Sequence, residues 1–144
     1  MNVSVKGEYA LRAVFELSLR GSRDPTKIAD IAARQAIPQK FLELILSQLK
    51  QGGFLGSRRG AEGGYFLARP PESITVGDIL RHIDGPVSPA RRRQKGHNAA
   101  ASPFPELWSE IEQALSQVID NTTFSNLVER WHEKNSRQVV NWEI

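Results

Sequence analysis

The chain has 144 residues and contains no cysteine. It therefore has no means of forming a disulfide, no thiolate nucleophile and no sulfur ligand for zinc or for an iron–sulfur cluster. Its three histidines, His82, His97 and His132, do not show the spacing of a metal site. A phosphate-binding loop of the P-loop type is also missing from the sequence. We therefore expect no metal and no cofactor.

The acidic residues do not indicate an enzyme either. Asp78, Glu106 and Glu110 are available carboxylates, but none is paired with a plausible base in a glycine-rich or histidine-rich setting. The sequence therefore predicts a protein that is not an enzyme.

Long apolar runs are absent as well, and none approaches the roughly 20 residues that span a bilayer. The first residues, Met1 to Lys6, lack the apolar core of a signal peptide. Apolar residues make up 40% of the chain and charged residues 24%, which is typical of a soluble globular protein. We therefore expect a cytoplasmic protein without a membrane partner.

The chain is mildly basic, with a formal net charge of +3. Many basic proteins bind no nucleic acid, so the placement of the charges matters more than their sum. Arg58 and Arg59 stand in a glycine-rich segment, and Arg91, Arg92, Arg93 and Lys95 stand in a later segment without periodicity. Arg58 and Arg59 are the more informative of these residues, because they follow three stretches in which apolar residues have helical spacing.

The N-terminal half shows three stretches with helical spacing of apolar residues. The first runs from about 6 to 19, and Gly21 fits its end. Thr26 is a candidate N-cap for a short second helix, and a turn at Gln35–Ala36 separates this helix from a third that begins at Pro38. The apolar stripe of the third helix consists of Phe41, Leu42, Ile45, Leu46 and Leu49.

A short hairpin is predicted directly after the third helix. The two strands would span 54–58 and 65–68, on either side of a glycine-rich turn. In that turn Gly60, Gly63 and Gly64 allow positive φ angles and close approach of the backbone. Helix, turn, helix and hairpin in this order are typical of a protein that reads duplex DNA.

The chemistry of the exposed positions supports this interpretation. Gln39, Lys40 and Glu43 lie off the apolar stripe at the N-terminal end of the third helix, where glutamine suits adenine, lysine suits guanine and glutamate suits cytosine. Arginines of the hairpin offer forked donors to phosphates or to a minor groove. The candidate DNA-binding residues are Gln39, Lys40, Glu43, Ser57, Arg58, Arg59, Gly60, Gly63, Gly64 and Tyr65. A solvated helix face, or a winged helix that binds a protein, is the alternative.

The second half predicts three more helices. Thr75 caps the first, over 76–83, and Thr122 or Thr123 caps the last. Between them a helix over 105–120 follows a long segment, 87–103, which we interpret as a mobile loop. One face of this middle helix is apolar and is predicted to mediate dimerisation through Leu107, Trp108, Ile111, Leu115, Val118 and Ile119.

Several motifs resemble one known family. They are Lys6–Ala10, Ile28–Ala32, Phe41–Glu43, Gly53–Leu55, Arg58–Tyr65, Ile74–Ile79 and Asp120–Phe124. In this order they resemble the Rrf-two family of bacterial winged-helix transcription regulators. The resemblance implies a mainly α fold with a small β-hairpin wing, and a homodimer formed through a long helix. It also implies a sequence-specific regulator of palindromic double-stranded DNA, with repression as the expected outcome and Arg59 entering the minor groove.

This resemblance divides the chain into three parts. Residues 1–84 would form the winged helix-turn-helix, 85–104 a loop in the sensor position, and 105–144 the dimerisation and C-terminal helices. Cluster-binding members of the family carry three cysteines in the loop, whereas this loop has none. We therefore expect regulation by a protein or small-molecule effector rather than by an iron–sulfur cluster. The alternative is a cluster sensor whose cysteines were replaced, since Ala99, Ala100 and Ala101 stand together there.

Overall fold

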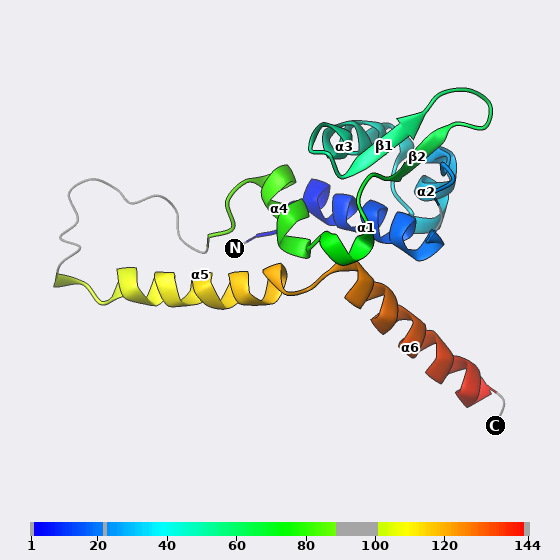
Figure 1. Cartoon of the computed structure of the whole chain (residues 1–144). Helices are drawn as coiled ribbons and strands as arrows, with labels where there is room; N and C mark the ends of the chain where they lie inside the picture. The colour runs from blue at the N-terminus through cyan, green and yellow to red at the C-terminus, as the bar shows by residue number, and fades with distance from the viewer. Residues whose placement is uncertain (1, 22, 89–100, 143–144) are drawn as a thin grey trace.

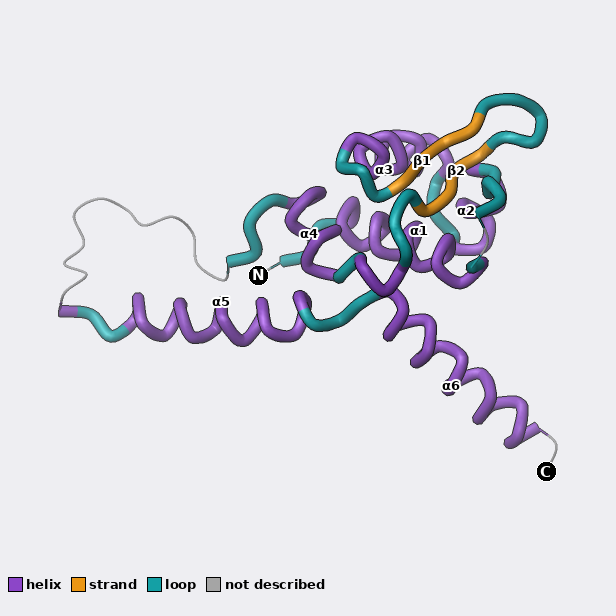
Figure 2. The backbone as a smooth tube through the Cα atoms, in the orientation of Figure 1, coloured by secondary structure: helices purple, strands orange, loops and turns teal. Residues whose placement is uncertain are grey.

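The computed structural model describes residues 2–21, 23–88 and 101–142, with side chains up to residue 137. Figures 1 and 2 show a mainly helical protein with one antiparallel hairpin, as the sequence predicts. The elements are α1 (Val5–Arg20), α2 (Ile28–Gln35), α3 (Gln39–Gln51), β1 (Leu55–Arg58), β2 (Gly64–Leu67), the short 3-10 turn η1 (Pro71–Ser73), α4 (Val76–Asp84), α5 (Phe104–Asp120) and α6 (Phe124–Trp142).

The core forms where the apolar stripes of the first three helices meet. Its buried members include Ala10, Ala13, Val14, Leu17, Ile31, Ile37, Leu42, Ile45, Leu46 and Leu49. This arrangement confirms the predicted helix periods, since residues three and four apart share one helix face. Phe41 is the exception in the stripe of α3: it is exposed, and its ring packs edge-on against Tyr9 with the ring centroids 5.7 Å apart.

Thr26 does not cap α2, contrary to the prediction, because the N-cap residue is Lys27. Instead, the backbone of Thr26 pairs with Tyr65 of β2. The amide of each residue donates to the carbonyl of the other, with N–O distances of 2.8 Å. Thr26 is only 3% exposed, so these two bonds satisfy polar groups that water does not reach. The residue therefore extends the hairpin by one bridge and ties it to the start of α2.

A second crossing of the chain attaches the C-terminal helices α5 and α6 to the body of the protein, which consists of α1 to α4 and the hairpin. The amide of Val76 donates to the carbonyl of Thr122 at 2.9 Å, and the amide of Phe124 donates to the carbonyl of Ile74 at 3.0 Å. Between these bonds, Thr75 and Thr123 form a β-bridge. The Phe124 side chain is 0% exposed and packs in the main core. We call this crossing, Ile74–Val76 against Thr122–Phe124, the junction.

Both helices that begin at the junction have a side-chain cap. Thr75 accepts a bond from the Asp78 amide and Asp78 accepts one from the Thr75 amide, which forms a capping box. Thr123 and Asn126 exchange the same pair of bonds at the start of α6. The hydroxyl of Thr122, by contrast, donates to the carbonyl of Val118 at the end of α5. Thr123 is therefore the cap among the two candidates.

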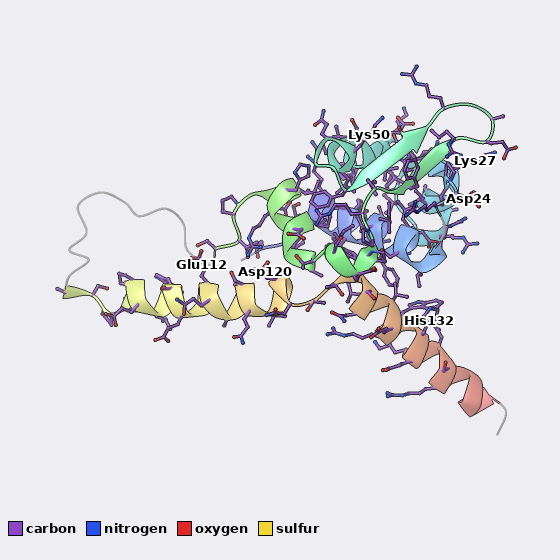
Figure 3. All side chains as sticks on the ribbon, in the orientation of Figure 1. Asp24, Lys27, Lys50, Glu112, Asp120 and His132 are labelled. Carbon is purple, nitrogen blue, oxygen red and sulfur yellow. The ribbon has the colours of Figure 1, made fainter. Side chains whose placement is uncertain are left out.

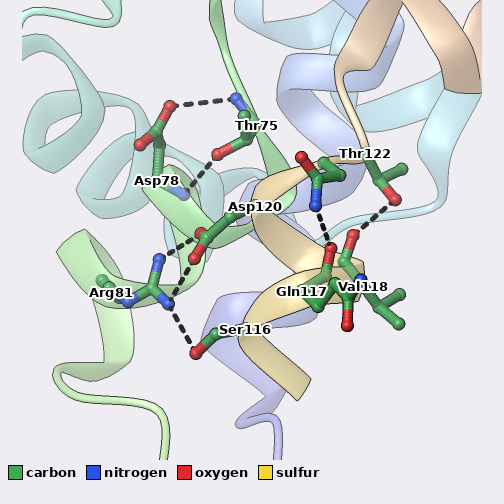
Figure 4. A network of polar contacts seen from close by, with 9 residues as sticks. Thr75, Asp78, Arg81, Ser116, Gln117, Val118, Asp120 and Thr122 are labelled. Carbon is green, nitrogen blue, oxygen red and sulfur yellow. Dashed lines mark hydrogen bonds and ion pairs between the residues drawn. The ribbon is translucent and has the colours of Figure 1, made fainter. Parts of the chain in front are cut away.

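An ion pair fixes α5 against α4 close to the junction (Figure 4). Arg81 binds both carboxylate oxygens of Asp120, and its Nη2 donates to Oδ2 at 3.0 Å. The hydrogen bonds that Arg81 donates to the Asp120 carboxylate raise the pKa of the guanidinium above its ordinary value. Gly77 lies directly beneath this pair, and a Cβ at this position would force the Asp120 carboxylate and the Arg81 guanidinium to shift. A bidentate pair of this kind sets both distance and angle.

The two C-terminal helices leave the body in different directions. Figure 1 shows α5 passing beneath α4 and continuing beyond it, whereas α6 extends away on the other side. Near its start, α6 lies against the main core, where Leu127 packs beside the buried residues. Further along, Trp131 is exposed.

We expect the Phe124→Ala variant to lose about 3–5 kcal/mol of unfolding free energy, because truncation of a fully buried phenylalanine removes apolar burial and leaves a cavity. The measurement is denaturant unfolding at one fixed protein concentration. Val5→Ala is the control, since Val5 is exposed on α1 and its loss should change stability by about 0.5 kcal/mol or less. Equal stabilities for the two variants would contradict the role given to the junction.

Candidate nucleic-acid interface

The exposed face of α3 carries the predicted base-reading side chains. Gln39, Lys40 and Glu43 are all exposed, as are Ser47 and Lys50 on the following turns. The opposite face of the helix is buried in the main core. A helix that is anchored on one side and polar on the other can enter a major groove without loss of its own packing.

The turn before α3 holds this helix at a fixed angle to α2. Ala36 takes up the left-handed conformation, with φ of 53°, and the amide of Ile37 donates to the carbonyl of Ala32 at 3.0 Å. The Ile31 and Ile37 side chains are buried beneath the turn. The predicted turn at Gln35–Ala36 is therefore present, and a residue other than glycine makes it.

The hairpin is joined to the C-terminal part of α3. Lys50 Nζ donates to Ser57 Oγ of β1 across 2.6 Å. Because side chains alternate along a strand, Arg58 faces the other side of the hairpin. There it lines a cavity of about 520 Å³ together with Arg23, Phe66 and Arg69, among others. Ser57 is therefore hydrogen-bonded within the protein, whereas Arg58 lines the cavity on the other side of the hairpin.

The tip of the hairpin is open to solvent. Arg59, Gly60 and Glu62 are exposed, and Gly60 has a φ of 105°. The next glycines are needed for packing. A Cβ on Gly63 would collide with the carbonyl of Arg58, and a Cβ on Gly64 would collide with the carbonyl of Thr26.

Tyr65 follows directly and packs against the main core, where it is half-buried. The ten candidate residues consequently separate into two groups. The solvent-facing group consists of Gln39, Lys40, Glu43, Arg58, Arg59 and Gly60. The group that supports the hairpin consists of Ser57, Gly63, Gly64 and Tyr65.

Two exposed residues of this surface, Lys27 and Leu44, are not among the ten predicted DNA-binding residues. Lys27 adds a positive charge at the start of α2, and Figure 3 shows it on the same side of the molecule as Lys50 and the hairpin. Leu44 lies on the exposed face of α3 and is 52% exposed. Its place outside the apolar stripe was the available signal.

The predicted dimerisation face of α5 divides in the structure. Leu107, Trp108 and Val118 are exposed. Ile119, by contrast, is 8% exposed and packs with Leu80 and Val87 in the same subunit; Leu115 is packed against this cluster. Ile111 is half-buried and belongs to neither described core cluster. Phe104, which was not among the predicted residues, is also exposed and stacks on Trp108.

The described part of the chain offers no metal site. Within residues 2–21, 23–88 and 101–142, no three side chains of the types His, Cys, Asp and Glu are grouped so that they could hold an ion. His82 faces the carbonyl of Gln48 at 2.7 Å. His97 and the basic segment from Arg91 to Lys95 lie outside the described residues. None of the helices in the described ranges is long and apolar enough to cross a membrane.

Comparison with known proteins gives a consistent result. The family described as Rrf2, iron-dependent transcriptional regulator, matches residues 3–130. The transcriptional regulator CymR of Bacillus subtilis is 37% identical over 127 residues, which is 88% of this chain and 89% of CymR. IscR of Klebsiella pneumoniae is 32% identical over 130 residues, which is 89% of this chain and 80% of IscR.

Solved structures agree with the sequence relatives. The structure of B. subtilis CymR, described as the global cysteine regulator of that organism, has a TM-score of 0.80 at 35% identity and covers 90% of this chain and 98% of its own. T. potens IscR has a TM-score of 0.76 at 30% identity and covers 93% of this chain and 90% of its own. The relatives are named as transcriptional regulators rather than as enzymes.

Proposed function

The chain belongs to the Rrf2 family of DNA-binding transcription regulators, and from this premise we propose that it acts as a homodimeric repressor on a palindromic operator. The observation that carries the proposal is the pairing of an exposed polar face on α3 with an exposed arginine at the hairpin tip. Two elements anchored in one core can enter neighbouring grooves of the same duplex.

The roles of the exposed residues follow from their chemistry. Gln39 and Lys40 would contact base edges in the major groove, and Glu43 would select bases with an amino donor, such as cytosine. Arg59 would enter the minor groove, where narrow A·T-rich segments attract arginine. Lys27, Lys50 and Arg58 would meet phosphates, which adds affinity without sequence choice.

The exposed apolar part of α5 supports the homodimer. Phe104, Leu107, Trp108 and Val118 leave an apolar face in water on a helix that extends beyond the body. A two-fold axis across this helix would cover the same residues on both copies. Each copy would present one reading head, the unit formed by α1, α2, α3 and the hairpin. The two heads would then meet half-sites about one or more helical turns of DNA apart, which requires a palindrome. Occupancy would repress transcription where such an operator overlaps a promoter.

An iron–sulfur cluster does not fit this chain, although the family description names iron dependence. Clusters are held by cysteine thiolates, with histidine as an occasional replacement. The sequence has no cysteine, and its three histidines stand far apart. We propose that the input is instead a protein or a small-molecule effector.

The proposed DNA binding is tested by selection from random duplexes at about 0.15 M salt, followed by titration of the enriched site. We expect a palindromic sequence and an affinity that falls steeply as salt rises, because bound phosphates release counterions. A winged helix that recognises a protein would enrich no sequence, which would contradict the proposal.

We expect Arg59→Ala to weaken binding to the selected site by about 1–3 kcal/mol, the usual value of a groove contact. The measurement is a titration with fluorescent duplex. Arg130→Ala is the matched control, since Arg130 is exposed on α6, away from the hairpin, and should leave affinity unchanged. The same affinity for both variants would exclude Arg59 from the interface.

We expect Ile111→Asp to weaken dimerisation by on the order of 3–5 kcal/mol, because it places an uncompensated charge in the apolar contact. Ile111 is a cleaner position than Leu115, which also packs within its own subunit. The measurement is sedimentation over a range of concentrations. Gln113→Asp is the control, since it adds the same charge at an exposed position off this face. A dimer that survives Ile111→Asp unchanged would show that another surface pairs the subunits.

We expect anaerobic incubation with iron and sulfide to leave the protein colourless after desalting, because the chain has no thiolate for a cluster. The measurement is the visible absorption spectrum together with iron and sulfide analysis. A stoichiometric chromophore that stays with the protein would refute the proposal of a cluster-free input.

A further inference from the structure

Leu44 lies on the exposed face of α3. Successive residues of an α-helix are turned by about 100° because one turn takes 3.6 residues. On this scale Lys40, Leu44 and Ser47 lie within about 60° of one another, on the side opposite the buried stripe of Leu42, Ile45, Leu46 and Leu49. Of the residues one turn away from Leu44, Lys40, Ser47 and Gln48 are polar and Phe41 is apolar.

The Leu44 side chain is 52% exposed. Among the described residues it belongs to neither apolar cluster. The other exposed apolar residue of α3, Phe41, packs its ring against Tyr9. Leu44 therefore keeps exposed apolar surface where the helix would meet a base pair.

We propose that Leu44 reads the C5-methyl group of a thymine in the major groove of each half-site. This inference rests on the DNA-binding function proposed above and adds a base that the polar residues do not select. Among the four bases only thymine presents a methyl group there, and an apolar side chain recognises it by contact. Leu44 cannot pair with donors or acceptors, so its preference comes from excluding water between two apolar groups.

The neighbours of Leu44 define where this thymine stands. Lys40 lies one helical turn before it and Ser47 one turn after it. The thymine is therefore expected inside the half-site, beside the base pairs that Lys40 contacts.

The inference is tested by removing single methyl groups from the DNA. In the selected operator, each thymine is replaced in turn by deoxyuridine, which lacks only the C5-methyl group and keeps the pairing. For the wild-type protein we expect one position per half-site to matter, with affinity falling about fourfold there, the factor that corresponds to one buried methyl. The symmetric double replacement should give about 15-fold, because the two half-sites contribute separately.

The variant Leu44→Ala completes the test. In the homodimer this variant changes both half-sites. It should therefore bind the thymine operator as weakly as the wild type binds the operator with the symmetric double replacement. Its affinity should no longer change when thymine is replaced by deoxyuridine. Ser47→Ala is the matched control on the same face and should keep the full methyl dependence. Since Leu44 is exposed, thermal unfolding should show that the variant is folded.

The outcomes separate this inference from the proposed function. Selection of a palindrome without any methyl dependence, or a methyl dependence that Leu44→Ala retains, overturns the role of Leu44 and leaves DNA binding in place. Failure to select any sequence overturns both.

Discussion

The junction is the constraint on which the rest of this structure depends. Two backbone hydrogen bonds, the bridge between Thr75 and Thr123 and the buried ring of Phe124 attach α5 and α6 to the body at one point. Directly beside it, Arg81 and Asp120 set the angle between α4 and α5, and a larger residue at position 77 would displace their side chains. In the proposed dimer this angle determines the distance between the two reading heads. The DNA spacing is therefore set far from the residues that would contact bases.

Much of the reading head could be predicted from the sequence, because local signals decide it. Apolar spacing located α1 and α3, and Thr75 was predicted correctly as the cap of α4. The structure adds that Asp78 completes a capping box with it. Thr26 was assigned wrongly for a physical reason. A threonine before a helix suits either an N-cap or a strand edge, and only the approach of Tyr65 from 39 positions along the chain decides between them.

The predicted dimerisation face shows a different limit. A helical period places Leu115, Val118 and Ile119 on one side of α5, but it does not reveal which of them the same subunit covers. The structure shows that Ile119 packs with Leu80 and Val87, whereas Val118 is 65% exposed. Leu44 illustrates the converse. The sequence already places Leu44 outside the apolar stripe of α3, but only the structure shows that its side chain is 52% exposed.

The helix-turn-helix and the hairpin behave as one unit, and this limits how a signal can reach DNA. The Thr26–Tyr65 bridge ties the start of α2 to β2, and Lys50 ties α3 to β1 through Ser57. All three helices of the head share the main core. Moving one reading element relative to another would break these contacts together, whereas rotating α5 about the junction disturbs mainly an exposed ion pair and the small cluster around Leu80. Because this rotation leaves the main core and both ties of the hairpin intact, it is the less costly change. An effector that acts on α5 would therefore alter the spacing of the two heads before it altered the base contacts of either.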